Sequence, residues 1–159
     1  MNRTIPFTRV FTLAVLSLIL MFLSGCAGTS KASESESAEA KNFTAPSGKG
    51  SVFLYRTGRA VGAAGQLRVK VNSQDAGGTG PGTFFRWDLS PGTYTFSSFT
   101  DESSAVIKIE VKAGEVYYIR QDARMGINNG RVTMKKVESD KGQKEVERCQ
   151  LLVSSYLPE

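Results

Sequence analysis

The sequence predicts an all-β domain: a small antiparallel β-sandwich of about seven strands, followed by a short C-terminal helix. From Gly50 onward, short runs rich in β-branched and aromatic residues alternate with clusters of Gly, Pro, Asn and Asp, which is typical of strands joined by turns. Several of these runs alternate apolar and polar residues, the pattern of a strand that buries one face. The domain is expected to fold without covalent cross-links, since about 100 residues can enclose a core.

The strands follow from these local patterns. Ser51–Arg56 is apolar on both faces and is therefore expected at the centre of a sheet. Lys112–Glu115 is expected to form a hairpin turn. The Gly77–Gly82 run contains G-x-G-x-G, but it joins two predicted strands and does not open a helix, so it predicts a loop and not a phosphate cradle. The seven expected strands are Ser51–Arg56, Gln66–Asn72, Thr83–Leu89, Thr93–Phe99, Ala105–Val111, Val116–Gln121 and Arg131–Val137.

The C-terminal segment fits two descriptions. Val146, Cys149, Leu152 and Val153 have spacings of three, six and seven residues, which predicts a short amphipathic helix over about 140–151. A terminal strand over 149–154 is the alternative. In the helical description Cys149 is a buried small apolar residue, and a reactive thiol beside Arg148 is the alternative to that role.

The N-terminal segment has the composition of an export signal. Residues 1–9 carry two arginines and no acid, and Val10–Phe22 is an apolar run of 13 residues. As a helix this run would span about 20 Å, short of the roughly 30 Å hydrocarbon core of a membrane. Its length favours a cleaved signal peptide over residues 1–25. Cleavage after Ala27 and an uncleaved anchor remain alternatives.

The residues at the end of this run resemble the lipobox of bacterial lipoproteins. They are Leu23, Ser24, Gly25 and Cys26, an aliphatic residue, two small residues and a cysteine. The resemblance implies that the sulfur of Cys26 carries a covalent lipid and that Cys26 is the first residue of the mature protein. Ala27 is not the aspartate that retains many lipoproteins in the inner membrane, which implies the outer membrane, facing the periplasm.

Residues 26–49 separate the anchor from the predicted sandwich. Ser, Ala, Glu, Lys and Gly dominate this segment, and Phe43 is its one large apolar residue. Such a composition buries too little surface to offset the entropy of ordering, so the segment is expected to be a flexible tether that reaches on the order of 25–30 Å. A short helix over 33–41 is the alternative. The chain then divides into a signal peptide (1–25), a lipidated tether (26–49) and a sandwich (50–159).

Composition limits the chemistry of the domain. The chain has 20 Lys and Arg against 15 Asp and Glu, and no histidine. The missing histidine removes the most frequent general base and metal ligand. The basic residues form no continuous stripe, and export also argues against nucleic acid as a partner. We expect no cofactor other than the lipid on Cys26 and no catalytic residue.

Adjacent aromatic residues suggest a surface for binding. In a strand, neighbouring side chains point to opposite faces, so the pairs Phe84/Phe85 and Tyr117/Tyr118 each direct one ring outward. An outward patch is therefore one interpretation, with a sugar chain or a protein as partner. The alternative is that a helix or loops cover both faces of the sheet. The residues proposed for the patch are Phe84, Arg86, Tyr117 and Arg120.

Four segments resemble the bacterial family called domain of unknown function 2846. They are 51–56, 67–72, 89–94 and 111–119, which hold a first strand, a second strand, a Pro-Gly turn and a Gly turn that leads into a Tyr-Tyr strand. The resemblance implies a lipoprotein with an Ig-like or carrier-type sandwich. The family has no assigned activity, so the resemblance implies no catalytic residue.

These observations lead to one hypothesis and one alternative. The hypothesis is an envelope lipoprotein, anchored in the membrane by its lipid, whose sandwich is a non-catalytic binding domain for an unidentified envelope protein or polymer. The alternative is an envelope enzyme that acts on cell-wall or lipid substrates through carboxylates or Cys149.

Overall fold

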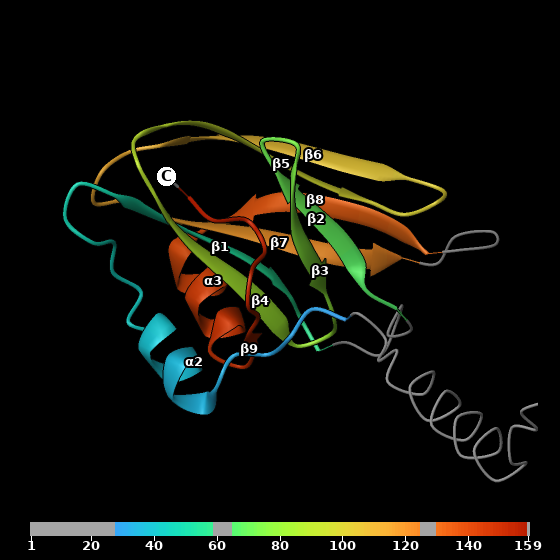
Figure 1. The fold of residues 1–159 in the computed structure, drawn as a ribbon, viewed down its shortest axis with the longest axis horizontal. Helices are drawn as coiled ribbons and strands as arrows, with labels where there is room; N and C mark the ends of the chain where they lie inside the picture. The colour runs from blue at the N-terminus through green and yellow to red at the C-terminus, as the bar shows by residue number, and fades with distance from the viewer. Residues whose placement is uncertain (1–27, 59–64, 125–129, 159) are drawn as a thin grey trace, which may run out of the picture.

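The computed structural model describes residues 28–58, 65–124 and 130–158, and it is a β-sandwich with two short helices on one side (Figure 1). This confirms the all-β sandwich that the sequence predicts. The strands are β1 (Gly50–Arg56), β2 (Leu67–Val71), β3 (Gln74–Thr79), β4 (Thr83–Leu89), β5 (Gly92–Phe99), β6 (Ser104–Val111), β7 (Val116–Arg124), β8 (Arg131–Val137) and β9 (Gln150–Leu151). The helices are α2 (Glu34–Ala40) and α3 (Ser139–Val146).

The two sheets differ in how their strands pair. One sheet has the order β8-β7-β1-β4-β9 and the other the order β3-β2-β5-β6. The second is antiparallel throughout, whereas β1 runs parallel to β7 and β4 runs parallel to β9. The first sheet is therefore mixed, and it departs from the predicted antiparallel arrangement at these two pairs. All of β1 is buried at the centre of that sheet, as its two apolar faces predict.

The parallel pair arises from the connection between β6 and β7, for which the predicted hairpin is wrong. Lys112–Glu115 was expected to form a hairpin turn, but β6 and β7 lie in different sheets. The turn therefore carries the chain across the sandwich. A chain that crosses here enters the first sheet beside β1 and in the same direction as β1, so both strands end at the same end of the molecule.

The strand β3 is absent from the predicted set. Asn72 and Ser73 have φ of 47° and 70°, the positive values that a two-residue hairpin turn of type I′ requires, and this turn joins β2 to β3. The loop expected over 77–82 is thus wrong for Gly77, Gly78 and Thr79, which lie in β3. A β-carbon on Gly77 would meet the side chain of Thr29 at 2.7 Å, so glycine is needed there for the N-terminal segment to approach.

The apolar side chains form two clusters, one on each side of the first sheet. The inner cluster fills the space between the sheets and includes Trp87, which stacks on Phe85 with ring centroids 5.2 Å apart. The outer cluster lies between the first sheet and the helices. Its members are Phe53, Tyr55, Phe84, Tyr118, Val137, Val146 and Cys149, with Ala40, Phe43, Val116 and Leu151 packed at its edge. Both faces of this sheet are therefore covered.

The segment 28–49 packs on the sandwich. Ser33 caps α2 through a capping box with Glu36, and the buried Ser37 hydroxyl accepts a hydrogen bond from the backbone N–H of Leu151 (3.1 Å). Phe43 lies 5.6 Å from the ring centroid of Phe53. The flexible tether expected over this segment is wrong for residues 28–49, whereas the alternative of a short helix agrees with α2. Backbone and ring contacts with the sandwich offset the low apolar content that suggested a tether.

The C-terminal segment combines both of its predicted descriptions. The helix α3 ends at Val146, five residues before the expected end, and the short strand β9 then pairs with β4. Val146, Cys149 and Leu152 are buried as the spacing predicts, but Val153 is 54% exposed. The expected signal peptide, with Leu23, Ser24, Gly25 and Cys26, lies outside the described residues. Among the residues that are described, no helix is long and apolar enough to cross a membrane.

Candidate functional site

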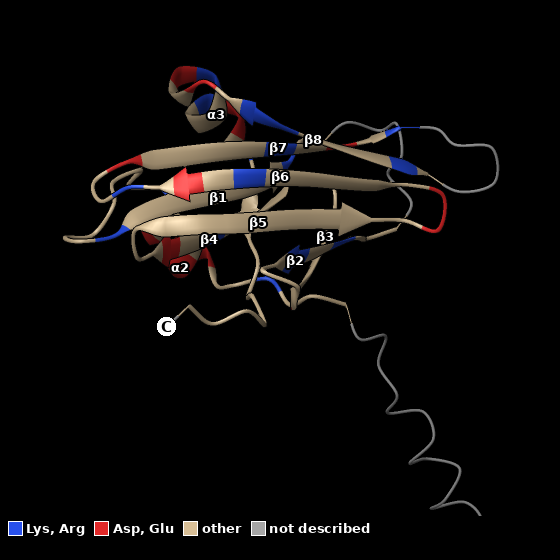
Figure 2. Ribbon diagram, turned by 90° about the horizontal axis from the view of Figure 1, so that it is seen from above, with Lys and Arg blue, Asp and Glu red and all other residues tan. Residues whose placement is uncertain are grey.

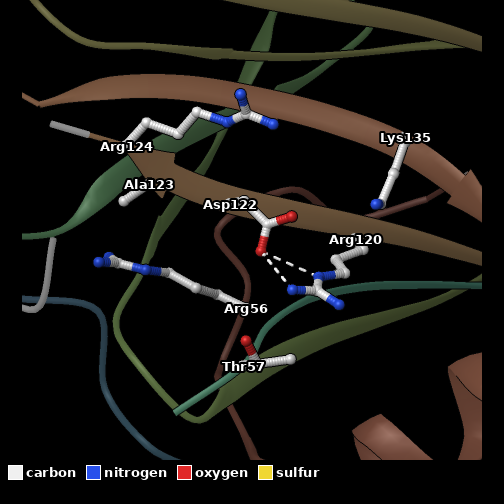
Figure 3. A pocket seen from close by; sticks show the side chains of 7 residues that line it. All are labelled: Arg56, Thr57, Arg120, Asp122, Ala123, Arg124 and Lys135. Carbon is white, nitrogen blue, oxygen red and sulfur yellow. Dashed lines mark hydrogen bonds and ion pairs between the residues drawn. The ribbon is translucent and has the colours of Figure 1, made fainter. Parts of the chain in front are cut away.

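A basic pocket of about 400 Å³ opens at the end of the sandwich where β1 and β7 both finish (Figure 3). The parallel pairing of these strands brings their last residues together, and β8 supplies one further side chain. We call this feature the basic pocket. It is lined by Arg56, Thr57, Arg120, Asp122, Ala123, Arg124 and Lys135.

Arg120 is held in a network on the floor of the pocket. Its Nε and Nη2 donate to the Oδ1 of Asp122, both at 2.9 Å, and its Nη1 donates to Glu145 of α3 at 2.9 Å. The Tyr55 hydroxyl donates to the other oxygen of Glu145 at 2.6 Å. Burial acts to lower the pKa of Arg120, but the hydrogen bond and charge of Asp122, with Glu145, outweigh burial and raise it. Two carboxylates therefore neutralise Arg120.

Arg56 is the last residue of β1 and is only 3% exposed. Its Nη1 donates to two backbone carbonyls, that of Gly65 at 3.1 Å and that of Thr79 at 3.5 Å. Burial lowers the pKa of Arg56, and the charge of Asp122 opposes this effect. Arg56 therefore holds the carbonyls of Gly65 and Thr79 at this end of the sandwich.

Arg124 and Lys135 provide the accessible charge of the pocket. Both side chains belong to exposed residues on neighbouring strands, β7 and β8. Among the described residues, neither has a carboxylate within ion-pair distance, in contrast to Arg120. In Figure 3 the side chains of Arg124 and Lys135 lie near the Arg120–Asp122 pair, whereas the guanidinium of Arg56 points away from it. The pocket therefore holds an excess of positive charge that Asp122 does not balance.

This arrangement can bind an anion. Guanidinium groups recognise the oxygens of phosphate or carboxylate groups with paired hydrogen bonds, and a lysine adds a flexible point charge. In the described part of the chain, no group of three or more Cys, Asp or Glu side chains is arranged to hold a metal ion.

The four residues proposed for an outward patch do not form one. Phe84 is fully buried in the outer cluster, and Tyr117 is 5% exposed in the inner cluster. The aromatic part of this prediction is wrong because the helices and the 28–49 segment cover Phe84 on the outer face, whereas Tyr117 points into the space between the sheets. Of the four residues, Arg120 alone lies in the basic pocket.

Arg86 instead holds the N-terminal segment against the sheet. Its Nη1 donates to the carbonyl of Ala40 at 2.8 Å and to the side chain of Asn42 at 2.7 Å, and its Nη2 donates to the carbonyl of Thr44 at 2.9 Å. Its guanidinium carbon lies 5.5 Å from the ring centroid of Phe53. These contacts assign Arg86 a structural role.

Cys149 agrees with the interpretation of a buried apolar residue. Cys149 is 4% exposed, and its thiol donates to the carbonyl of Glu145 at 3.3 Å. Burial raises the pKa of this thiol to about 11, an effect that Lys41 opposes and Glu145 reinforces. At neutral pH the group is therefore a thiol and not the reactive thiolate.

Three basic residues of the pocket could not be assigned from the sequence: Arg56, Arg124 and Lys135. They lie far apart in the chain, and each reads as one of many dispersed basic side chains. One signal was present: Arg56 ends the single run that is apolar on both faces, and a charge that continues such a run is poorly hydrated. The parallel pairing of β1 with β7, which brings Arg56 and Arg124 to the same end of the sandwich, has no signature in the sequence.

Comparison with known proteins identifies relatives but no activity. Residues 46–134 match the family model described as "Protein of unknown function (DUF2846)". The chain is also 26% identical to an uncharacterized protein of Haemophilus influenzae over 147 residues, which cover 92% of this chain and 87% of that protein. The family predicted from four segments is thereby confirmed. The matched region contains Arg56, Arg120 and Arg124, and Lys135 follows its last residue.

Proposed function

Since this chain belongs to the DUF2846 family, whose description names no activity, we propose its function from the geometry of the described residues. The protein is a lipoprotein of the bacterial envelope, anchored through a lipid on Cys26 to the outer membrane and facing the periplasm. Its sandwich is a non-catalytic binding domain that takes an anionic group of an envelope component in the basic pocket. It needs no cofactor and does not bind nucleic acid.

The observation that carries this proposal is the uneven charge of the basic pocket. Arg120 is matched by Asp122 and Glu145, and Arg56 is buried with its Nη1 bonded to backbone carbonyls, so the exposed Arg124 and Lys135 supply the accessible positive charge. The network around Arg120 also holds the pocket in one shape, because it joins β7 to α3 and, through Glu145, to Tyr55 of β1. A rigid site loses little entropy when a ligand binds.

The anion site is tested by titrating the mature protein with pyrophosphate and following backbone amide shifts by NMR. We expect saturable shifts at the ends of β1, β7 and β8 that weaken with added salt, as charge-driven binding does. The double variant Arg124→Gln/Lys135→Gln should lose them. The matched control Lys108→Gln/Lys112→Gln removes the same charge from exposed positions on and after β6 and should retain them. Equal binding by both double variants would refute the site.

The anchor is tested by mass spectrometry of the protein purified from cell membranes. We expect an N-terminal peptide that begins at Cys26 and carries the added mass of a lipid. The variant Cys26→Ala should be recovered with its signal peptide intact or in the soluble fraction. An unmodified Cys26 in the mature protein would refute the proposed anchoring.

A further inference from the structure

We infer that the basic pocket faces the membrane that holds the anchor and binds the phosphate of an anionic lipid headgroup there. This inference rests on the proposed lipid anchor and the proposed anion site. It adds a partner and an orientation to both.

The first step is where the packed chain begins. Gly28 lies beside Gln66, since a β-carbon on Gly28 would be 3.1 Å from Nε2 of that side chain. The hydroxyl of Thr29 accepts a hydrogen bond from the backbone N–H of Gly78 at 2.6 Å. Figure 1 shows the described chain starting at the end of the molecule where β1 and β3 finish.

The second step links this start to the basic pocket. The two carbonyls that accept hydrogen bonds from Arg56 are those of Gly65 and Thr79. These residues are the direct chain neighbours of Gln66 and Gly78, which contact the start of the packed segment. The anchor-side segment and the buried arginine of the pocket therefore share the same end of the sandwich.

The third step is the short length of chain between Cys26 and the packed segment. One residue, Ala27, separates Cys26 from Gly28. Consecutive Cα atoms are about 3.8 Å apart, so the Cα atoms of Cys26 and Gly28 are separated by no more than roughly 7.6 Å. A lipid on Cys26 consequently brings this end of the sandwich to the membrane surface, whereas the expected tether over 26–49 would have allowed every orientation.

The fourth step is charge. Anionic headgroups attract basic side chains within about one Debye length, roughly 8 Å at physiological salt. Figure 2 shows basic segments at the neighbouring ends of β7 and β8, with an acidic segment in the β5–β6 turn at the same end. In that turn Glu102 lies 3.9 Å from Arg131, which offsets its charge. The accessible charge of Arg124 and Lys135 is thus presented to the headgroups.

The inference is tested on the lipidated full-length mature protein in vesicles that contain phosphatidylglycerol and a headgroup-spin-labelled lipid. A fluorophore is attached at one of two exposed turn positions, Pro81→Cys or Ala113→Cys in the β6–β7 turn. Position 81 lies at the pocket end, because the N–H of the adjacent Gly82 donates to the carbonyl of Arg56 at 3.0 Å. The two positions lie at opposite ends, since β7 spans nine residues, about 30 Å. The buried thiol of Cys149 contributes little background labelling.

We expect strong quenching at position 81 and weak quenching at position 113. Each basic residue near an anionic surface strengthens membrane association about fivefold. The variant Arg124→Gln/Lys135→Gln should therefore lower the ratio of docked to undocked protein about 25-fold. The control Lys108→Gln/Lys112→Gln should leave the quenching at position 81 unchanged. Equal quenching at both positions, no effect of the pocket variant, or the same quenching in purely phosphatidylcholine vesicles would each overturn the inference.

A pyrophosphate titration of the same lipidated protein in detergent separates the two proposals. Binding that depends on Arg124 and Lys135, together with quenching that does not, would overturn the headgroup inference and leave the anion site standing, with a free phosphate or a phosphate-bearing polymer as ligand. Pocket-independent results in both measurements would overturn both.

Discussion

Replacing Gly142 with alanine is expected to destabilise the protein by about 2 kcal/mol, although the same change in an exposed helix is stabilising. A β-carbon on Gly142 would lie 2.3 Å from Cγ and 2.5 Å from Cβ of Tyr118. The Tyr118 ring is 2% exposed and is stacked on Phe53 with centroids 5.3 Å apart, so it cannot move aside. The helix α3 must therefore shift away from the sheet.

The expected magnitude follows from three contributions. Overpacking of a close contact costs about 1–3 kcal/mol. The shift of α3 also exposes part of Val146, whose complete burial contributes about 1.5–3 kcal/mol. Alanine in place of glycine recovers about 1 kcal/mol through helix propensity. The two losses exceed the gain, and the net effect is about 2 kcal/mol.

Urea denaturation followed by far-ultraviolet circular dichroism measures this effect, and thermal unfolding should show a midpoint lower by roughly 5–10 °C. Gly80→Ala is the matched control, because no atom lies within 4 Å of the added carbon, and we expect its stability to equal or slightly exceed that of the parent. A Gly142→Ala variant as stable as the parent would refute the close packing of α3 on Tyr118.

Three further predictions concern the core, the helix cap and pH. Gln121→Leu should lower the free energy of unfolding by about 1–3 kcal/mol, because the buried hydroxyls of Thr79 and Ser98 lose their amide partner. In urea denaturation, the triple variant Gln121→Leu/Thr79→Val/Ser98→Ala should recover part of that loss, since it also removes the two hydroxyls. Ser33→Ala should lower the free energy of unfolding by about 1 kcal/mol and speed amide hydrogen exchange in α2, because it removes the capping hydroxyl. Unchanged exchange rates in α2 would contradict this role of Ser33. Because burial raises the pKa of Cys149 to about 11, the folded state holds this proton more tightly, so the free energy of unfolding should fall between pH 9 and 11, with a shallower slope in Cys149→Ala.

The sequence predicts the strands well because alternation reports burial directly. The seven expected runs all form strands, and the fully apolar run at Ser51–Arg56 is central. Alternation says which face a residue occupies but not which strand lies beside it. The parallel pairing of β1 with β7 therefore could not be predicted, although it decides where Arg56 and Arg124 meet.

The missed elements share a physical cause. The strand β3 holds Gly77 and Gly78, which have no side chain to show an alternating pattern. The segment 28–49 has few apolar residues, but its backbone is paired: the N–H of Ala32 donates to the carbonyl of Leu151, and the N–H of Val153 donates to that of Ser30, both at 2.9 Å. Backbone pairing does not depend on side-chain hydropathy, so composition alone suggested a tether.

The packing of the 28–49 segment on the first sheet explains why this segment is not a tether and why Phe84 is not exposed. It also limits where a partner can bind. The 28–49 segment covers the outer face of the first sheet, where the ammonium of Lys41 lies 5.9 Å from the ring centroid of Phe84 and Arg86 donates to the carbonyl of Ala40. Aromatic rings on that face are consequently not available to a partner. The same segment begins with Thr29 bonded to β3, close to the carbonyls that hold Arg56. By packing along the sheet, the segment closes the face as a binding surface and leads the proposed anchor to the end of the sandwich where the basic pocket lies.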